Sequence, residues 1–347
     1  MPHPRVVAPG LPYVGRVTQP PMRSSRAFCL AIGVILTTGA VAHPTDSGRA
    51  EHRVKSLKIT VLSTMLAEPG IGEWGFSALV EADGHRILFD TGNRPETVLQ
   101  NARDLKIDLS TVTDVVLSHH HGDHTGGLVT LRRELAGKTP AALSRIHVAP
   151  GIFSSRRRPG QQDEANPTIA LKSEIEASHA TFVEHRTPEE IFPGVWLTGP
   201  IPRPHAERNW GAPESIVTSG GPVTDSIPED MALIVNTDRG MVVIVGCGHA
   251  GTINTVEYGR KILGPEPVYA LIGGLHLFAA TDSALAWTAV RLREARLGYL
   301  LGGHCTGIEA VYRIRELAAL GRKRAVVAAV GSSFDASKGI DPLQLAQ

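Results

Sequence analysis

The chain has 347 residues, of which 42% are hydrophobic and 20% charged, enough to bury the core of one large domain or two small ones. Its 35 basic and 34 acidic residues leave a formal net charge of +1, so there is no electrostatic case for nucleic-acid binding. Three cysteines are too few for a disulfide scaffold.

The first 42 residues have the pattern of a leader. Residues 1–21 are rich in proline and valine and show no periodicity, which is typical of a disordered extension or of a stretch upstream of the true start. From Met22 the chain holds two arginines, a short apolar run at residues 27–36 and a small-x-small triplet that ends at Ala42. We expect cleavage after Ala42, export to the periplasm or the medium, and no stable membrane insertion afterwards. An uncleaved N-terminal anchor is the alternative.

A domain is predicted over residues 55–335, and it opens with strands. Runs of branched and aromatic side chains predict them at residues 57–62, 76–82 and 86–89. Asp83 and the glycine after it separate the last two strands and are a strong hairpin signal. The third strand ends in Asp90, which either caps a helix predicted over residues 96–105 or supports a neighbouring site from behind.

A histidine-rich stretch over residues 119–124 is the strongest motif, and it follows a buried strand predicted over residues 113–117. Open α/β sheets place their sites at the carboxyl ends of strands. His119 and His121 are two residues apart, so in an extended segment their side chains point the same way. His120 then points away, which predicts a role in packing or in supporting the ligands.

The end of this motif supplies ligands for a second metal ion. Gly122 permits a tight turn, so Asp123 and His124 follow on a chain that has changed direction. Imidazole nitrogens and carboxylate oxygens suit zinc, and also iron or manganese. We therefore expect two divalent metal ions, zinc by preference. A surface tract that binds metal incidentally is less favoured, because it needs neither the aspartate nor the glycines.

Two polar segments follow the motif. Residues 154–167 include three consecutive arginines, which usually form a solvated surface. If this segment lies near the site, Arg157 is suited to hold an anionic group of a substrate. Residues 199–229 are rich in proline and glycine, and we interpret them as a loop that forms a pocket wall. His205 and Glu207 on this loop are either substrate contacts, metal ligands or ordinary surface residues.

The second half of the chain repeats one plan three times: a strand ends in glycine and then histidine, and a helix follows. The strands are predicted over residues 241–246, 268–273 and 299–302. The histidines are His249, His276 and His304. Because equivalent strand ends meet at one edge of a sheet, we expect these side chains to converge with the histidine-rich motif. The adjacent glycines let the backbone come close to the metals.

The His-x-His-x-Asp-His pattern at residues 119–124 resembles the signature of the metallo-β-lactamase superfamily, over residues 57–330. The later motifs Gly-Cys-Gly-His-Ala-Gly, Gly-Gly-Leu-His-Leu and Gly-His-Cys-Thr-Gly are similar to those of the branch named after dihydropteroate- and dihydropterin-type synthases. They differ from those of true β-lactamases, lactonases and glyoxalases. The superfamily's bridging aspartate has no counterpart here. Cys247 stands nearest that position, and His249 follows two residues later.

The resemblance implies a fold and a set of site residues. The fold is a four-layer αβ/βα sandwich of the α/β (α+β) class, the metallo-β-lactamase fold. One ion is assigned to His119, His121 and His249, and the other to Asp123, His124 and His304. The side chains expected beside these ligands are Asp90 and Cys247. The catalytic candidates are Asp123 and His276, and the substrate-binding candidates are His276 and Arg157. His276 is either a further ligand or a donor to a substrate oxyanion.

Export would leave two cysteines, Cys247 and Cys305. An oxidising compartment permits a disulfide between them, but we favour two separate thiols near the metals. Of Cys247 and His249, we favour the histidine as the metal ligand.

The expected function is a metal-dependent hydrolase or transferase of this superfamily, with two metal ions, that acts on a small anionic molecule such as a phosphorylated one. The alternatives are a redox di-iron protein of the same fold and a non-enzymatic metal-binding protein of the cell envelope. Hydrolysis of β-lactams fits less well, since the later motifs do not match. The expected partner is a small-molecule substrate, and the oligomeric state stays open.

Overall fold

The computed structural model of the protein describes residues 52–207 and 213–344. The leader predicted over residues 1–42 lies outside these ranges, so its cleavage and the export of the chain stay predictions. Within the described ranges, no helix combines the length and the apolar character that crossing a membrane requires.

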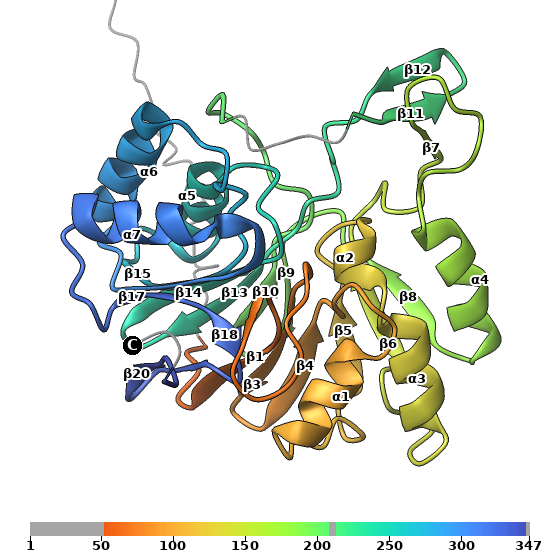
Figure 1. Ribbon diagram of the computed structural model, residues 1–347, viewed down its shortest axis with the longest axis horizontal. Coiled ribbons are helices and arrows are strands. Elements are labelled where there is room, and N and C mark those ends of the chain that lie inside the picture. The colour runs from red at the N-terminus through yellow and green to blue at the C-terminus, as the bar shows by residue number, and fades with distance from the viewer. Residues whose placement is uncertain (1–51, 208–212, 345–347) are drawn as a thin grey trace, which may run out of the picture. The chain divides into compact units, whose positions relative to one another are not determined.

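One mixed sheet is built mainly by the first half of the chain (Figure 1). Its strands lie in the order β20 (Gly339–Asp341), β19 (Ser333–Asp335), β1 (Leu57–Ser63), β3 (Ser77–Ala82), β4 (His85–Phe89), β5 (Asp114–Val116), β6 (Arg145–Val148) and β8 (Thr181–Glu184). Strands β3 and β4 form the predicted hairpin, and β4, β5, β6 and β8 run parallel. The carboxyl ends of these four parallel strands therefore meet at one edge of the sheet.

The second mixed sheet is built mainly by the second half of the chain. Its strands lie in the order β17 (Ala325–Val327), β16 (Tyr299–Gly302), β15 (Val268–Gly273), β14 (Gly240–Val245), β13 (Leu233–Thr237), β10 (Val195–Leu197) and β9 (Glu189–Phe192). Strands β13 and β14 form a hairpin, and β14 to β17 run parallel. The three predicted strands that end in glycine and histidine are thus neighbours in one sheet.

Helices cover the outer face of each sheet (Figure 1). Those of the first half are α1 (Thr97–Asp104), α3 (Leu128–Ala136) and α4 (Thr168–Ala177), whereas the short helix α2 (Gly122–Thr125) lies beyond the carboxyl end of β5. Those of the second half are α5 (Thr252–Leu263), α6 (Asp282–Glu294) and α7 (Ile308–Leu317), with the short 3₁₀ helix η1 (His304–Thr306) before α7. The sequence pattern gave no indication of α4.

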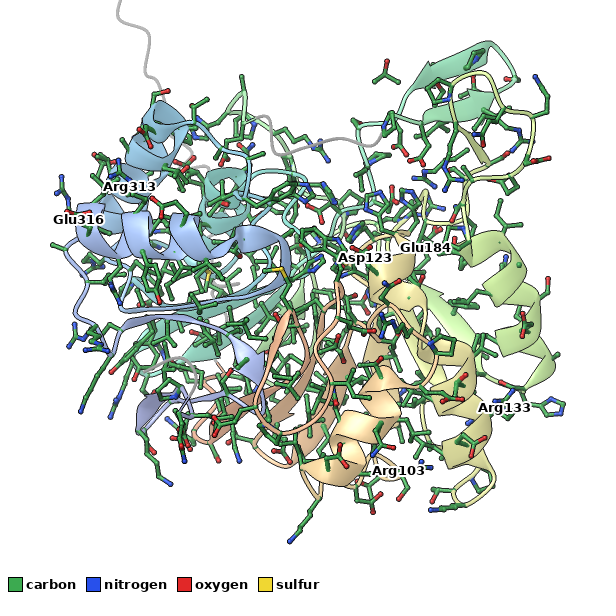
Figure 2. All side chains as sticks on the ribbon, viewed as in Figure 1. Arg103, Asp123, Arg133, Glu184, Arg313 and Glu316 are labelled. Carbon is green, nitrogen blue, oxygen red and sulfur yellow. The ribbon has the colours of Figure 1, made fainter. Side chains whose placement is uncertain are left out.

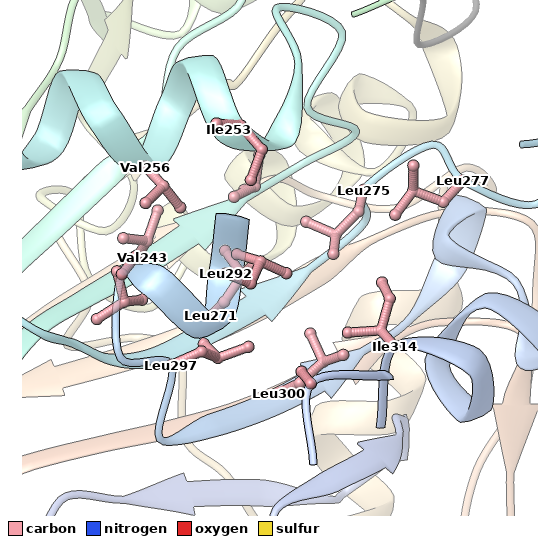
Figure 3. Close-up of a cluster of buried hydrophobic side chains, with 14 of the residues drawn as sticks. Val243, Ile253, Val256, Leu271, Leu275, Leu277, Leu292, Leu297, Leu300 and Ile314 are labelled. Carbon is pink, nitrogen blue, oxygen red and sulfur yellow. The ribbon is translucent and has the colours of Figure 1, made fainter. Parts of the chain in front are cut away.

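Alternation along the strands divides the core into layers. Leu79 of β3 packs under the helices of the first half, whereas its neighbour Val80 packs between the two sheets. In β14, Ile244 faces the space between the sheets and Val243 faces the helices of the second half. Figure 3 shows Val243 among side chains from α5, α6 and α7. The predicted four-layer αβ/βα sandwich is confirmed.

Two smaller sheets complete the described chain. One contains β12 (Gly221–Thr224), β11 (Ser215–Thr218) and β7 (Arg156–Arg157), and the other β18 (Ala329–Val330) and β2 (Leu66–Ala67). The prediction of an unbroken loop over residues 199–229 is therefore wrong in its second part, where β11 and β12 form a hairpin. Strand β7, part of the arginine run, pairs with this hairpin.

Candidate metal centre

The histidine-rich motif lies at the carboxyl end of β5. The buried strand leads straight into His119, and the backbone is still extended at His121, with φ −62° and ψ 144°. Helix α2 begins at Gly122 and turns the chain, which brings Asp123 and His124 round to the same locus. Figure 2 shows Asp123 where the two halves of the domain meet. The turn predicted at the glycine is confirmed.

The second half contributes from the ends of three parallel strands. Strand β14 leads into Cys247 and His249, β15 into His276, and β16 into His304. These strands are neighbours in one sheet, so the loops after them lie side by side. The predicted convergence of the two halves is confirmed by the distances between their side chains.

One cluster of ligand atoms contains only histidines. One atom each from His119, His121 and His249 lies within 4.8 Å of the others. His119 is fully buried, and its Nε2 atom has no hydrogen-bond partner among the described residues. A buried nitrogen of this kind is costly unless something binds it, and a metal ion is a partner that imidazole suits.

A second cluster contains the carboxylate. The Oδ1 atom of Asp123 lies 3.9 Å from His124 Nε2, and its Oδ2 atom lies 3.3 Å from His304 Nε2. The structure therefore brings together the three residues that the sequence assigned to the second ion. The mixture of two imidazoles and a carboxylate suits zinc, iron or manganese.

Cys247 links the two clusters. Its Sγ atom lies 3.0 Å from His124 Nε2, and one atom each from Cys247, His119 and His124 lies within 4.8 Å of the others. The same sulfur atom and one nitrogen atom each of His249 and His276 also lie within 4.8 Å of one another. The thiol thus stands among the ligand atoms themselves, between the two groups.

Cys305 is the second thiol that the sequence analysis expects near the metals, although it was not assigned a role there. Its Sγ atom lies 3.2 Å from that of Cys247, both thiols are buried, and both are free. The preference for two thiols over a disulfide agrees with this geometry, although the two sulfurs touch. The signal in the sequence was the Gly-His-Cys-Thr-Gly motif, in which the cysteine is the immediate neighbour of His304.

Three residues of the site have a backbone that non-glycine residues rarely adopt. The φ angles are +55° at Asp90, +49° at His276 and +47° at His304. Such conformations cost free energy and persist where the surrounding structure enforces them, typically at functional sites. All three follow a strand of one of the two main sheets and hold their side chains at the common locus.

Asp90 supports the metal loop. Its carboxylate accepts hydrogen bonds from the Ser118 amide at 2.7 Å and from the Ser118 hydroxyl at 2.8 Å, and it lies 2.7 Å from His124 Nδ1. A carboxylate at Nδ1 fixes the orientation of the ring and leaves Nε2 for a metal. The alternative role as a helix cap is wrong, because Glu96 occupies the cap position of α1.

His120 points to the opposite side of the motif. Its Nδ1 atom lies 2.6 Å from Glu229 Oε1, and Glu229 accepts two bonds from the buried guanidinium of Arg156. Arg157, the predicted substrate contact, donates instead to Glu164 Oε2 at 2.9 Å. Its contact with a substrate stays a prediction, whereas its neighbour Arg156 ties β7 to the metal loop.

Burial and charge prepare the ligands for a cation. Burial and the neighbouring imidazoles hold the pKa values of His119 and His121 well below the usual range. Burial alone would raise the pKa of Asp123, but His124 and His304 outweigh it and keep the pKa low. At neutral pH His119 and His121 are therefore neutral and the carboxylate of Asp123 is ionised, the states that bind metal.

His205 and Glu207, the candidate substrate contacts on the loop that begins at residue 199, lie near this centre. His205 and Glu207 line a cavity of about 640 Å³ together with His276. Neither belongs to the two histidine and carboxylate clusters described above. The interpretation of the first part of the loop as a pocket wall agrees with this cavity.

Comparison with known proteins places these features in a family. The family model of the metallo-beta-lactamase superfamily matches residues 75–253. The chain is 31% identical over 271 residues to 7,8-dihydropterin-6-methyl-4-(beta-D-ribofuranosyl)-aminobenzene-5'-phosphate synthase of Methanocaldococcus jannaschii, covering 74% of this chain and 90% of that protein. It is 29% identical over 245 residues to an uncharacterized protein of the same organism, covering 70% of this chain and 88% of that one.

A solved structure gives the same result. The metal-dependent hydrolase of the beta-lactamase superfamily Tm1679 superposes with a TM-score of 0.65 at 27% sequence identity. The match covers 80% of this chain and 98% of that one. The similarity therefore extends over both halves of the sandwich.

Proposed function

The chain belongs to the metallo-beta-lactamase superfamily, and on that premise we propose that it is a hydrolase or transferase that uses two divalent metal ions, zinc by preference. The observation that carries the proposal is the pair of ligand clusters joined by Cys247, each with donors from both halves of the domain. A metal-binding fold in this family implies divalent ions, and imidazole, carboxylate and thiol donors fit them.

The proposed ligand sets follow the geometry. One ion would be held by His119, His121 and His249, and the other by Asp123, His124 and His304. Cys247 would hold both. When bound, such ions supply a nucleophile at neutral pH and stabilise negative charge that develops on the substrate. Asp90 keeps the ring of His124 in the orientation that this requires.

His276 has a different role in this proposal. Its side chain is partly exposed, whereas the rings of His119, His249 and His304 are buried. A ring at the open side of the centre can donate a hydrogen bond to the oxygen on which negative charge develops. His121 is also half-buried, but it does not line the cavity beside the centre, whereas His276 does, so we assign His276 to the substrate.

The substrate class that we propose is a small anionic molecule such as a phosphorylated one. The archaeal relative supports this class, because its name describes a product with a 5'-phosphate. The same name describes a synthase, whereas the structural relative is called a hydrolase. Transfer to water and transfer to another acceptor use the same metal chemistry, so both remain within the proposal.

The test is turnover of model substrates by the purified protein loaded with zinc, manganese or iron in turn. Phosphomonoesters, phosphodiesters, lactones and carboxylic esters cover the proposed chemistry. We expect metal-dependent cleavage of at least one class, lost in His121→Ala and kept in the control Lys261→Ala, at an exposed position of helix α5. A protein that binds metal and cleaves none of them would favour the non-enzymatic alternative. Iron in the purified protein, together with consumption of oxygen, would favour the alternative of a redox di-iron protein.

A further inference from the structure

Two thiols are in contact inside the metal centre, and the proposed ligand sets use only one of them. Cys247 Sγ lies 3.2 Å from Cys305 Sγ, and both side chains are buried. The proposed function places Cys247 between the two ions and gives Cys305 no part. Cys305 is thus a buried nucleophile whose sulfur touches that of a proposed ligand.

The contact between the thiols is not a consequence of neighbouring strands. Cys247 follows β14 and Cys305 follows β16, and β15 lies between these two strands in the sheet. Adjacent strands are about 4.8 Å apart, so β14 and β16 are separated by about 10 Å. The loops after β14 and β16 therefore bend toward each other beyond the end of β15.

Gly274, just after β15, leaves the space in which the two loops meet. A Cβ atom at this position would lie 2.2 Å from Gly246 O and 2.8 Å from Cys305 Sγ, so a side chain would push the loops apart. The Gly274 amide donates to Gly246 O at 3.1 Å, and the Leu277 amide donates to Cys305 O at 3.0 Å. The loop after β15 thus holds the backbone beside both thiols and keeps the sulfurs together.

The two sulfur atoms are close enough to bond after a small movement. A disulfide has an S–S length of about 2.05 Å, so from 3.2 Å the sulfurs have to approach by about 1 Å. Small rotations about the Cα–Cβ bonds of the two cysteines move the sulfurs by that much. No rearrangement of the strands is required for the thiols to become a disulfide.

A small oxidant has a route to the thiols. His276 is half-buried and lines a cavity of about 640 Å³, and one of its ring nitrogens lies within 4.8 Å of Cys247 Sγ. The cavity and the thiols are therefore separated by one side chain. Hydrogen peroxide is little larger than water, so it is an oxidant of suitable size for this route.

We propose that Cys247 and Cys305 form an oxidation site that takes hydrogen peroxide and closes to a disulfide, and that this withdraws Cys247 from the metals. The inference rests on the proposed function for the role of Cys247 as a ligand. The disulfide itself is measured without turnover, and its formation does not depend on the identity of the substrate.

The reaction consumes one hydrogen peroxide for two thiols. Cys305 Sγ attacks one oxygen atom, the O–O bond breaks, and a sulfenic acid and one water form. Cys247 Sγ then displaces the hydroxyl group from the sulfenic sulfur, so the S–S bond and a second water form. The sulfurs lose two electrons, the peroxide gains them, and the thiol protons end in the two waters. Because thiolate is the form of cysteine that binds metal, Cys247 in a disulfide is no longer a ligand.

The experiment follows the mass and the metal content of the zinc-loaded full chain during treatment with hydrogen peroxide. Cys29→Ser in this parent leaves Cys247 and Cys305 as the only cysteines. We expect the intact mass to fall by about 2 Da, the two hydrogen atoms of the thiols. About one ion per chain should pass to a chelating dye in step with this loss. Dithiothreitol with added zinc should restore both values.

Cys305→Ser in the same background removes the partner thiol. We expect it to start with the metal content of the parent, because Cys305 is in neither ligand set, and to release metal at least about tenfold more slowly under peroxide. Equal rates of release from the two proteins would overturn the proposal. So would a parent that gains oxygen without losing about 2 Da, or one that closes the disulfide and keeps all its metal. The parent's own mass and metal content decide the matter if the serine variant does not fold or starts with less metal.

Failure of the proposed function is seen separately. A parent that binds zinc, loses about 2 Da and releases metal, yet turns over no substrate, would leave the oxidation site standing without the proposed activity. A parent that binds no zinc would remove the proposed function and the release of metal together. The mass after peroxide treatment would then still show whether the two thiols close to a disulfide.

Discussion

The carboxylate of Asp90 holds the metal loop at three atoms, the amide and hydroxyl of Ser118 and Nδ1 of His124. Asp90→Asn keeps the shape of the side chain and removes its charge. We expect the affinity for the metals to fall about 10–100-fold, because the ring of His124 loses the partner that orients it. Competition with a chelator measures this affinity. Asp104→Asn, at the exposed end of α1, is the control, and equal affinities of the two variants would contradict the supporting role.

The Sγ atom of Cys247 lies beside ligand atoms of both clusters. If sulfur holds metal, Cys247→Ala should lose about one ion per chain, while Cys247→Asp should retain both, since a carboxylate can span two ions. Metal content and a thiolate-to-cobalt charge-transfer band in the cobalt-substituted parent report on the same bond. Full metal content in Cys247→Ala, with no such band in the parent, would leave His249 as the ligand and Cys247 as its neighbour only.

At the scale of elements, strand β7 is fastened to the metal loop by one buried guanidinium. Arg156 Nε lies 2.6 Å from Asp225 Oδ2, Nη2 lies 2.9 Å from each oxygen of Glu229, and Glu229 contacts His120. Arg156→Met leaves two buried carboxylates without their cation, so we expect a loss of about 3–5 kcal/mol in the free energy of unfolding.

Arg157→Met is the matched control for that variant, because the neighbouring guanidinium is partly exposed and pairs only locally with Glu164. We expect it to cost less than about 1 kcal/mol. Urea unfolding of both variants decides the point, and equal losses of stability would show that the buried guanidinium does not fasten β7.

A second buried charged group, the carboxylate of Asp114 on β5, contacts Arg145 and His147 on the neighbouring strand β6. Burial alone would raise the pKa of Asp114, but hydrogen bonds from His147 and Arg145 outweigh it and hold the pKa well below its usual range. A depressed carboxyl pKa stabilises the fold above the unfolded-state value of about 4, and this stability is lost as the pH falls below it.

Asp114→Asn tests this linkage. At pH 7 we expect the variant to be less stable than the parent by about 1–3 kcal/mol, because a charged acceptor is lost. The difference should shrink as the pH falls from about 5 to 3, since the unfolded parent then takes up the proton. Unfolding of both metal-free proteins across this range measures the difference, and a constant difference would contradict the assignment to Asp114.

For the whole molecule, local patterns in the sequence predicted most strands near the site and the convergence of their ends, whereas the four-layer sandwich was implied by the resemblance to the superfamily. Strands of the two sheets alternate between two buried faces, and the strand ends that carry the histidines are marked by glycine followed by histidine or by the His-x-His motif. These signals lie within a few residues of one another, and the parallel order of the strands then brings their ends together. That is why His249, His276 and His304 were placed correctly without coordinates.

Pairings across long separations could not be predicted in this way. Arg156 meets Glu229 across 73 residues, and nothing in a run of three arginines tells the buried one from its exposed neighbours. Cys305 also meets Cys247 across a long separation, of 58 residues, but here the His304-Cys305 motif let the sequence predict that both thiols lie near the metals. Helix α4 buries only three of its residues, so its apolar face gives little periodic signal.

In the proposed metal centre, both halves of the domain hold the metals together. Plasma mass spectrometry of the purified parent, His121→Ala and His249→Ala tests it most directly, since His121 comes from the first half and His249 from the second. We predict about two divalent ions per chain in the parent and a clear loss in both variants. A parent without metal, or a His249→Ala protein with the full complement, would contradict it.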